Sequence, residues 1–592
     1  MIKNKSRKIR KNMQHNKSIN NISEIGVFAK DSDTLTSTLC EVIGKFKLKS
    51  HLVPFDALKS KGLAISSIVS ILTLLPFYGI SSIYGFIKNG IMDSDISGKK
   101  DVYYDVKNNE LIDWRTLLLL HAKRFRFLML QNQSTIINGI RAIIFDDTQI
   151  EKTGKKTEKV SSTFDHVTMR YVLGYKLLVC GFWDGGSFIP LDFSFHREKG
   201  TKNQELIRIF KKAQNVLEKT RCALEKCTGC VSKKEIALTN WTRTCEVKPN
   251  KTNKIKLTNA QNIYSKVSQE HTQYAQDLTL REKEFEQAKK KLKQFYQKGK
   301  IFGLTPKERK EQFKKDVANA SFGHTRRTEA NKSKIDMTIE MLSRSVKNGF
   351  IPDYVLTDSW FFCFEILEKL STLKNGAIKL VSMVKINNQK FFDCKANKEL
   401  PIRMILKRHE KESKTCKSMK SKYIRVTCKY KGIRVNLFFV KMGRSQNWHL
   451  LLTTNLTLNF TDLMKVYQIR WTIEVFFKEC KQYLNLGKCK SSCFDAQIAD
   501  TTVTMLQHIM LSYYKRINCQ QTFGGLFAAI SKEMVELDLV SRMIGLIGEL
   551  IEVICLIAGF DFIELQEQLF ENDQTMAIFS RMIPERLLNK AA

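Results

Sequence analysis

The sequence predicts an α/β protein, and three observations lead to this fold class. Apolar segments rich in Val, Ile, Phe and Tyr occur at 141–147, 169–184, 187–196 and 353–362, and such segments are typical of strands. Segments with apolar residues three or four positions apart surround them and indicate helices. The chain has 592 residues, of which 43% are hydrophobic, which is enough for a large core and several domains.

The predicted elements follow a definite order: three strands, a helix, a strand, another strand and a helix. The first three strands are expected to form an antiparallel meander, because Gly185 and Gly186 provide a tight turn between the second and third. This is the element order of a ribonuclease-H-like fold, which we therefore expect for the core. The first helix, the two later strands and the last helix are expected at 333–348, 353–362, 377–386 and 467–481.

Two insertions and two flanking regions accompany this core. The segment 200–335 is rich in Lys and Glu and poor in aromatic residues, which predicts a basic helical insertion, with a coiled-coil-like pair of helices as one possibility. The segment 390–456 alternates apolar and polar residues, which predicts a β-rich insertion. Both flanking regions have helical patterns. The expected boundaries are 1–137, 138–199, 200–335, 336–389, 390–456, 457–495 and 496–592.

The chain carries a large positive charge. It has 98 Lys and Arg residues against 59 Asp and Glu residues, a net charge of +39. The excess is spread along the chain, although residues 1–18 form a basic segment that we interpret as a disordered arm. Lys and Arg gain affinity for nucleic acids by releasing the counterions that surround the phosphates. The composition therefore favours a polyanionic partner.

Cysteine usage indicates a reducing compartment. The 15 cysteines do not have the regular spacing of a disulfide framework. Cys222, Cys227, Cys230 and Cys245 are close in sequence but include a single CxxC pair. Incidental thiols are therefore favoured there, with a zinc site as the alternative.

One uncharged segment is long enough to cross a membrane. Residues 62–87 have the necessary length, but Pro76 and several Ser and Gly residues interrupt the apolar pattern. Because proline breaks a helix interior, two buried helices separated at Pro76 are favoured over a membrane span.

Carboxylates occur at three points of the predicted core. Asp146 or Asp147 ends the first strand, Asp358 ends the fourth strand, and Glu474 lies on the last helix. Adjacent strand ends bring two carboxylates together, and a helix packed over them supplies a third. Three oxygen donors suit Mg²⁺ or Mn²⁺. Two such ions can activate a water molecule and stabilise the leaving oxygen in phosphoryl transfer.

Glu474 belongs to a row of four polar side chains with helical spacing. Tyr467, Arg470, Glu474 and Lys481 are 3, 4 and 7 residues apart, so on one helix they fall within roughly 60° of arc. A solvated surface with an ordinary Glu474–Lys478 pair is the simpler explanation. A carboxylate flanked by two cations and a phenol also suits a site for phosphates.

The same segment, YQIRWTIEVFFKECK at 467–481, resembles the Tyr-x2-Arg-x3-Glu-x6-Lys signature of bacterial insertion-sequence transposases of the DDE type. The segments IIFDDTQI and YVLTDSWF resemble the strands that carry the two Asp residues of this family. The segment NWHLLLTTN resembles a strand of the family's β-insertion. The resemblance covers about residues 137–495 and is specific only at these motifs.

The resemblance implies a cut-and-paste DNA transposase with two bound Mg²⁺ or Mn²⁺ ions. Asp146, Asp358 and Glu474 would bind the ions. Asp147 is the alternative to Asp146, but the family's first Asp usually stands two residues before a Thr, and Thr148 therefore favours Asp146.

The resemblance also implies how the protein would bind DNA. Tyr467, Arg470 and Lys481 would contact phosphates beside the cut, and Trp448 would stack on a flipped base. The partners would be double-stranded DNA, both terminal inverted repeats and target, and a second copy of the chain in an end-paired homodimer. The N-terminal region would recognise the repeats and the C-terminal region would dimerise, in the bacterial cytoplasm at the nucleoid.

Two other functions belong to different classes. One is a catalytically inactive DNA-binding protein with a ribonuclease-H-like fold, which three intact acids disfavour. The other is a membrane-associated protein that spans the bilayer at 62–87. Neither explains the spacing of the acids and cations.

Overall fold

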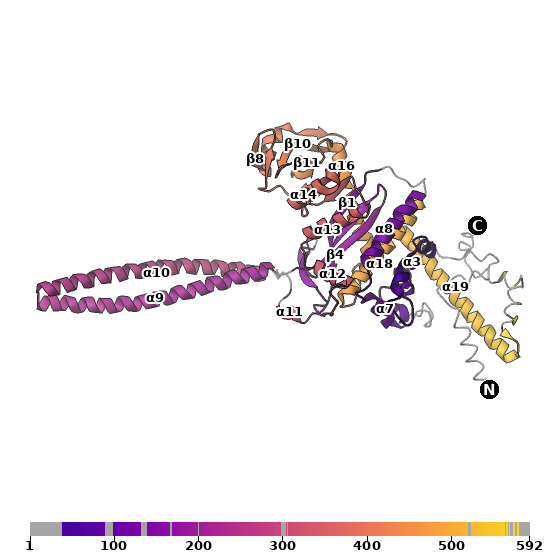
Figure 1. Cartoon of the computed structure of the whole chain (residues 1–592), viewed down its shortest axis with the longest axis horizontal. Coiled ribbons are helices and arrows are strands. Elements are labelled where there is room, and N and C mark those ends of the chain that lie inside the picture. Colours follow the sequence, from indigo (N-terminus) through magenta and orange to yellow (C-terminus); the bar gives the residue numbers. More distant parts are fainter. Residues whose placement is uncertain are drawn as a thin grey trace.

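The computed structural model shows an α/β protein in which helices surround a large mixed sheet (Figure 1). This confirms the fold class predicted from the sequence. Two helical segments extend away from the core on different sides. The structure describes residues 38–88, 99–131, 139–165, 168–198, 201–297, 304, 306–443, 445–518 and 522–562, with scattered positions between 564 and 578.

The described strands belong to one sheet with the order β2-β3-β1-β5-β6-β12-β11-β10-β7-β8, in which β4 also pairs with β3 and β9 with β10. The strands are β1 Ala142–Glu151, β2 Ser161–Asp165, β3 Arg170–Trp183, β4 Phe188–His196, β5 Tyr354–Thr357, β6 Lys379–Val384, β7 Lys390–Asp393, β8 Lys398–Pro401, β9 Lys414–Cys416, β10 Ser421–Tyr430, β11 Ile433–Met442 and β12 His449–Thr453.

The central part of the sheet combines antiparallel and parallel pairs. Strands β1, β3 and β4 are antiparallel neighbours, whereas β5 is parallel to both β1 and β6. Strand β12 is antiparallel to β6, so the strands of the segment predicted as a β-rich insertion continue the central sheet. The insertion and the core thus share one hydrogen-bonded ladder.

Three strands differ from the sequence prediction. Strand β1 does not end at the acids but continues to Glu151, which pairs with Gly174 of β3. The change from apolar to polar residues at Asp146 therefore marks a decrease in burial. It does not mark the end of the strand, since the hydrogen bonds to β3 continue. Strand β5 has only four residues, and β2 was not predicted because its sequence SSTFD has little apolar character.

The N-terminal helices pack around α18 and the sheet. Pro76 lies in the 3-10 helix that separates α4 from α5, as predicted. None of the described helices is both long and apolar enough to cross a membrane. The basic segment 1–18 lies outside the described residues. These elements are α2 Thr38–Lys45, α3 Leu48–Asp56, α4 Ile65–Leu74, the 3-10 helix η3 Leu75–Tyr78, α5 Ile83–Lys88, α7 Lys100–Lys107 and α8 Trp114–Gln131.

The later helices include the most buried one, α18, which packs against α4, α7, α8 and β4. They are α11 Pro306–Lys310, α12 Phe322–Glu329, α13 Lys334–Lys347, α14 Phe364–Thr372, η5 Leu373–Gly376, α15 Ile402–His409, η6 Glu410–Glu412, α16 Phe460–Gln468, α17 Trp471–Tyr483, α18 Phe494–Ile517 and α19 Phe523–Ala558.

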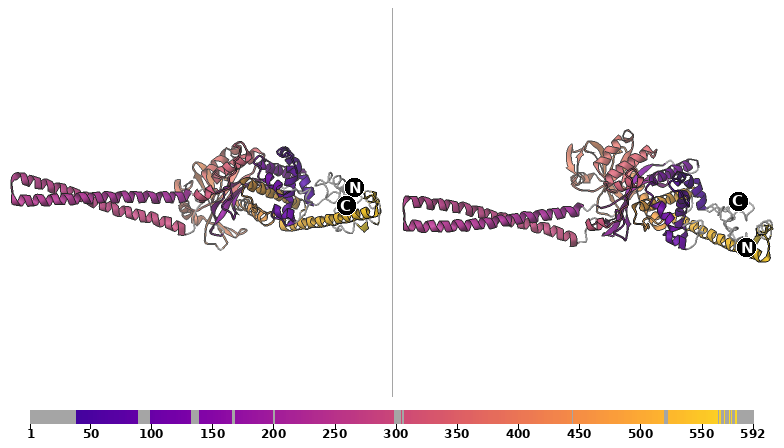
Figure 2. Two further views of the ribbon diagram at one scale, coloured as in Figure 1. Left: turned by 90° about the horizontal axis from the view of Figure 1, so that it is seen from below. Right: turned by 60° about the horizontal axis from the view of Figure 1, so that its bottom comes forward.

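Two long helices, α9 Thr201–Val247 and α10 Lys251–Gln297, form a hairpin that extends away from the core (Figures 1 and 2). Each helix has 47 residues, which corresponds to about 70 Å at 1.5 Å per residue. We call this hairpin the arm. Helix α19 extends from the opposite side of the core.

The segment 467–481 is not the single helix that we predicted. Tyr467 lies in α16, and Arg470 is the residue before α17. The backbone NH groups of Ile469, Arg470 and Ile473 each donate to a carbonyl three residues earlier, which is the tighter 3-10 pattern. The four signature side chains therefore do not form a single row on one helix.

A cluster of aromatic rings packs α17 against the sheet. Phe476 of α17 lies 5.0 Å from Phe188 of β4 and 4.8 Å from His508 of α18, between ring centroids. Phe188 in turn packs directly over Gly181 of β3, where a side chain would overlap its ring. Because Phe476 is two residues from Glu474, this packing determines where the Glu474 carboxylate lies.

Candidate functional site

The parallel pairing of β1 and β5 places two of the predicted acids at equivalent positions. Ile144 of β1 lies opposite Leu356 of β5. Two residues further on are Asp146 within β1 and Asp358 immediately after the end of β5. Two carboxylates that are 212 positions apart in sequence are thereby brought to neighbouring strands.

Asp146 lies in a half-buried environment with both signs of charge around it. Burial raises the pKa of the Asp146 carboxyl to about 7, and the nearby Asp358 and Asp147 act in the same direction. The Asp147 backbone NH donates to Asp146 Oδ1 at 2.8 Å, and Arg470 Nη1 donates to Oδ2 at 3.1 Å. These two donors oppose the effect of burial.

Arg470 also connects Asp146 to Glu474. Its Nη2 donates to Glu474 Oε1 at 2.5 Å, so one guanidinium group bonds two carboxylates. The exposed fractions of the Arg470, Asp146 and Glu474 side chains are 15%, 17% and 33%. The 3-10 turn before α17 places Arg470 at this point. The structure thus brings these three predicted residues into direct contact.

Asp358 follows directly after β5 and is held by the backbone. The NH groups of Trp360 and Phe361 donate to its Oδ1 at 2.9 and 3.3 Å. This turn keeps the side chain at the carboxyl end of β5.

Tyr467 lies beside the acids. Burial raises the pKa of its hydroxyl to about 12, with Asp358 and Asp146 adding to the effect and Arg470 opposing it. The Arg470 guanidinium carbon lies 5.7 Å from the centroid of the Tyr467 ring. The Tyr467 Oη is buried and has no well-formed hydrogen bond within the described part of the chain.

Lys481 lies further along α17 and contacts the same strand as Asp146. Its Nζ donates to Thr148 Oγ1 at 2.7 Å. Lys481 is exposed, and Thr148 is two residues beyond Asp146. The lysine is therefore close to β1 without contacting the carboxylates.

The two adjacent acids of β1 have different neighbours. Asp146 contacts Arg470, whereas Asp147 Oδ2 lies 3.0 Å from Lys334 Nζ at the start of α13. Lys334 Nζ also lies 4.2 Å from the centroid of the Trp360 ring. This geometry favours Asp146 as the acid that acts with Glu474, because Arg470 bonds both of these carboxylates.

The sequence prediction missed Lys334 and Trp360. Trp360 has 46% of its surface exposed beside Asp358, and Lys334 neutralises Asp147. In the sequence, Lys334 is an ordinary residue in the first turn of a helix, and nothing in its neighbourhood connects it with β1. The position of Trp360 two residues after a predicted strand-end acid was the available signal.

Trp448 lies at the same edge of the sheet but not in contact with the acids. It immediately precedes β12, whose Leu450 pairs with Val384 at the carboxyl end of β6. Asp358 follows the neighbouring strand β5 at this same edge. Trp448 is half-buried, and Lys441 Nζ lies 5.1 Å from the centroid of its ring.

No three of the described His, Cys, Asp and Glu side chains are grouped closely enough to hold a metal ion as they stand. This applies to the acids above and to the cysteines of α9. The donors nevertheless fit a hard cation. They are carboxylate oxygens, burial and the neighbouring Asp358 and Asp147 raise the pKa of Asp146, which a bound cation would offset, and a cationic group already lies between Asp146 and Glu474.

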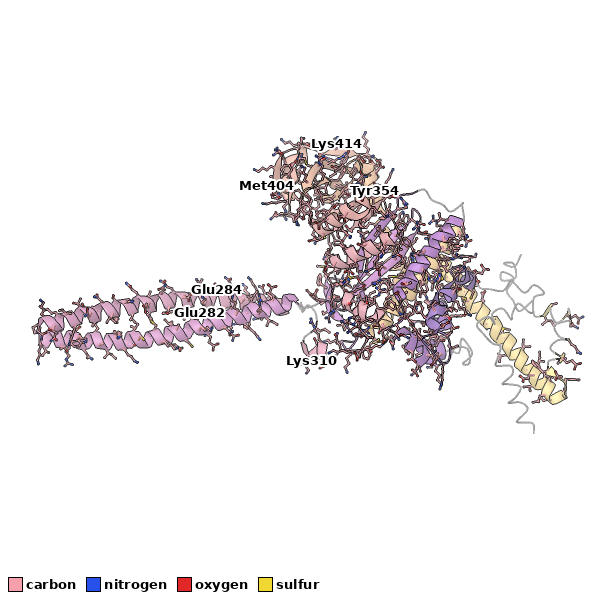
Figure 3. The ribbon with its side chains drawn as sticks, viewed as in Figure 1. Glu282, Glu284, Lys310, Tyr354, Met404 and Lys414 are labelled. Atoms are coloured by element: carbon pink, nitrogen blue, oxygen red, sulfur yellow. The ribbon has the colours of Figure 1, made fainter. Side chains whose placement is uncertain are left out.

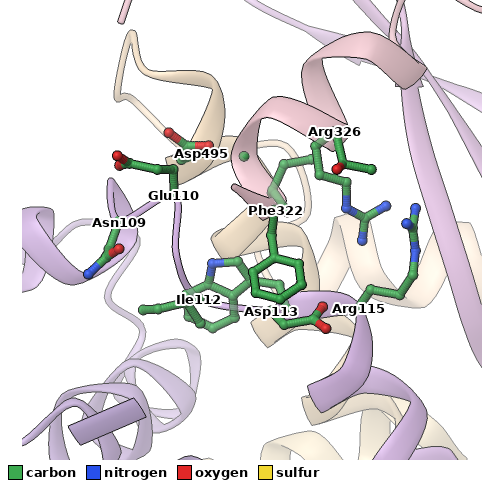
Figure 4. A pocket seen from close by; sticks show the side chains of 12 residues that line it. Asn109, Glu110, Ile112, Asp113, Arg115, Phe322, Arg326 and Asp495 are labelled. Atoms are coloured by element: carbon green, nitrogen blue, oxygen red, sulfur yellow. The ribbon is translucent and has the colours of Figure 1, made fainter. Parts of the chain in front are cut away.

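A small cavity elsewhere is part of the scaffold (Figure 4). It has about 30 Å³ of space, room for about one water molecule, and its lining includes Trp114, Arg326 and Asp495. None of the predicted site residues lines it. Asp495 is held by the buried Arg327, whose guanidinium also bonds Glu158, so this region joins α12, α18 and the loop after β1.

A comparison with known families gives a match for part of the chain. Residues 307–511 match the family described as Transposase DDE domain, which supports a DDE-type transposase function. The matched segment is about a third of the chain and contains Asp358, Trp448, Arg470 and Glu474, but not Asp146. Transposases act on DNA, and those of the DDE type generally use divalent metal ions. No curated protein matches the chain.

Proposed function

We propose that this protein is the transposase of a bacterial insertion sequence, which cleaves DNA at the ends of its element and joins the freed 3′ ends to target DNA. The observation that carries the proposal is the junction of β1, β5 and α17. There Arg470 bonds both Asp146 and Glu474, and Asp358, which follows the strand parallel to β1, lies near enough to raise the pKa of Asp146. Two of these acids lie in the segment that matches the transposase family.

The sheet supports a ribonuclease-H-like core. Its central order is β4-β3-β1-β5-β6, with three antiparallel strands followed by two parallel ones. This agrees with the element order expected from the sequence. In this arrangement the acids lie on central strands and on the helix that covers them.

Asp146, Asp358 and Glu474 would hold Mg²⁺ or Mn²⁺, with two ions expected. Bound divalent ions supply Lewis-acid stabilisation and an activated water for phosphoryl transfer. Arg470 neutralises Asp146 and Glu474 in the present structure. When a cation is bound by these acids, the guanidinium becomes available for a DNA phosphate, to which arginine bonds through two nitrogens.

The remaining signature residues would hold the DNA. Tyr467 offers a buried hydroxyl that lacks a well-formed hydrogen bond, and Lys481 offers an exposed ammonium group beside β1. Hydroxyl and cationic side chains are common phosphate contacts. Trp448 would stack on a base flipped out near the cut, where stacking offsets the cost of unpairing.

The active form would be a homodimer that pairs two element ends. Along α19, exposed apolar residues are spaced alternately by four and three positions, which is the heptad pattern of a coiled coil. We call this row the α19 seam, and its side chains are 40% to 81% exposed. It consists of Leu539, Met543, Leu546, Leu550, Val553 and Ile557.

The test uses a DNA fragment that carries the inverted repeat found beside the gene. Asp146→Asn, Asp358→Asn and Glu474→Gln should each bind this fragment about as well as the parent but leave it uncut in Mg²⁺. Because bound metal contributes several kcal/mol to the reaction, cleavage should fall by at least about 10³-fold.

Asp147→Asn is the matched control, since it removes an adjacent carboxylate that Lys334 already neutralises. It should retain most of the cleavage activity. Parental cleavage by Glu474→Gln would contradict the proposal. If the parental protein binds the DNA fragment tightly but never cuts it, the chain is an inactive DNA-binding protein.

A further inference from the structure

We infer that the outer end of the arm is a binding surface for duplex DNA, remote from the carboxylates. The outer end is residues 236–269, the last part of α9, the turn and the first part of α10. It contains six basic residues and one acid, Glu246. The basic residues, all exposed, are Arg243, Lys248, Lys251, Lys254, Lys256 and Lys266.

The inner part of the arm has a different charge balance. Its helices are joined by an Arg221–Glu282 ion pair at 2.9 Å and by the packing of Phe210 on Phe285. Arg281 pairs with Asp277 and Glu284. Figure 3 shows Glu282 and Glu284 on the part of the arm nearer the core. Across the inner part, residues 201–235 and 270–297, nine acids offset more than half of the charge of 15 basic residues, whereas one acid faces six at the outer end.

The cations of the outer end are not matched in this way. Within the described residues, no ion pair involves any of the six. Lys256 instead lies over the ring of Trp241, at 5.0 Å from its centroid. The excess of basic over acidic residues at this solvent-exposed end does not help the hairpin to fold. Binding of an external anion explains this excess.

The start of α10 strengthens this argument. A helix N-terminus carries a partial positive charge and is normally stabilised by Asp or Glu in its first turn. The first turn of α10 has no acidic residue and has Lys251 and Lys254 instead. Asn250 Oδ1 accepts from the Asn253 backbone NH at 2.7 Å, but this cap brings no negative charge, so helix end and side chains add to one positive region that suits an anion.

The uncharged residues favour DNA over other anionic partners. Between the cations lie Asn and Thr residues such as Asn240, Thr252 and Asn259, whose side chains can contact DNA phosphates. An arm of about 70 Å spans roughly 20 base pairs at 3.4 Å each. The arm would thus contact the DNA one to two turns from the cut.

The inference rests on the proposed function only for its DNA partner, so binding can be tested apart from cleavage. The full-length triple variant Lys248→Gln, Lys251→Gln, Lys254→Gln is compared with Lys219→Gln, Lys283→Gln, Lys290→Gln, which removes the same charge from exposed lysines of the inner part. The probe is a fluorescent 40-base-pair duplex of mixed sequence, and Kd is measured by anisotropy at several salt concentrations.

The outer variant should bind about tenfold more weakly at low salt, and its slope of log affinity against log salt should fall by about 2.7, or 0.9 per lost phosphate contact. The inner variant should stay within about twofold of the parent. Equal losses in both variants, or no loss in the outer one, would overturn the inference. So would tighter outer-end binding to an RNA duplex or to anionic lipid vesicles.

A crosslinking experiment removes the remaining ambiguity. Benzoylphenylalanine in place of Thr252 should crosslink to the duplex under ultraviolet light, whereas the same residue in place of Gln287 should not. If the parent fails to cut DNA but these results hold, the proposed function fails and the arm surface stands. If the parent cuts and Thr252 gives no crosslink, the arm surface fails alone.

Discussion

His121 of α8 is a buried histidine that connects the N-terminal helices. Its Nδ1–H donates to the Leu117 carbonyl at 2.9 Å, and its ring lies between Phe46 and His51. Its Nε2 is buried without a partner in the described part of the chain. Burial lowers the pKa of His121 to about 4, so the ring is neutral in the folded protein.

This histidine should make the protein less stable in acid. Above its usual pKa of 6.5 the ring is neutral in both folded and unfolded chains and contributes no pH dependence. Below pH 6.5 the His121 ring takes up a proton in the unfolded chain, whereas in the folded chain it stays neutral down to about pH 4. The contribution of His121 to stability should therefore fall by about 3 kcal/mol between pH 6.5 and 4, as measured by the difference in urea unfolding between the parent and His121→Phe.

His121→Phe should lose this part of the pH dependence and keep the parts that come from other groups whose pKa values burial shifts, such as His196 and Asp146. His449→Phe, which changes an exposed histidine at the start of β12, is the control and should keep it. A variant at His121 whose unfolding midpoint still falls with acid as steeply as the parent's would disprove the assignment.

At the residue scale, the sequence predicted which side chains matter but not all of their contacts. The signature spacing indicated Arg470 and Glu474, and the structure joins them. The spacing could not indicate that Arg470 also bonds Asp146, since this contact depends on how α17 packs over β1. The pairing of Lys334 with Asp147 depends on the position of α13 and has no local signal at all.

At the element scale, the packing of α17 depends on a glycine in β3. Gly181 lies at an irregularity in the β3–β4 pairing, and Phe188 occupies the space above it. Gly181→Ala should push Phe188 toward Phe476 and displace α17. Such overpacking costs about 1–3 kcal/mol, and strand cleavage should fall more than DNA binding because Glu474 moves.

Gly229→Ala is the matched control. Gly229 lies within α9, and an added methyl group there would meet no other atom within 4 Å. Since alanine favours a helix over glycine by about 1 kcal/mol, this variant should be as stable as the parent or slightly more so. Unchanged cleavage by Gly181→Ala would show that the cluster of aromatic rings does not position the site.

Periodicity predicted the type of most elements better than their ends. Apolar spacing is continuous through Ile469, Ile473 and Phe476, so the sequence suggested one helix where α16 and α17 are separate. The break arises from the 3-10 hydrogen bonds at 469–473, which tertiary packing selects. Likewise the pairing of β1 with β3 beyond the acids follows from a partner strand that periodicity does not identify.

At the scale of the whole molecule, the basic helical insertion was apparent from composition and a pair of packed helices was one of its expected forms, but its extension away from the core was not expected. Two helices of 47 residues can pack on a core or on each other, and the number of apolar positions decides between these. Here the apolar residues suffice only for a two-helix seam. The continuous ladder from β6 to β12 was also not predictable, because pairing between distant strands leaves no mark on either.

The α19 seam gives the last prediction, which concerns assembly. A helix that extends from the core with six exposed apolar side chains in heptad spacing is unstable alone in water and is stabilised when a second copy covers the seam. Leu546→Lys with Leu550→Lys places two charges in that seam and should convert the proposed dimer to a monomer, as measured by sedimentation velocity. Glu552→Lys changes the net charge by the same two units at a position outside the seam and should leave the dimer intact.

The monomeric variant should still bind a single element end but should not pair two ends, because pairing needs both copies. A double variant that sediments as a dimer would show that another surface joins the two copies.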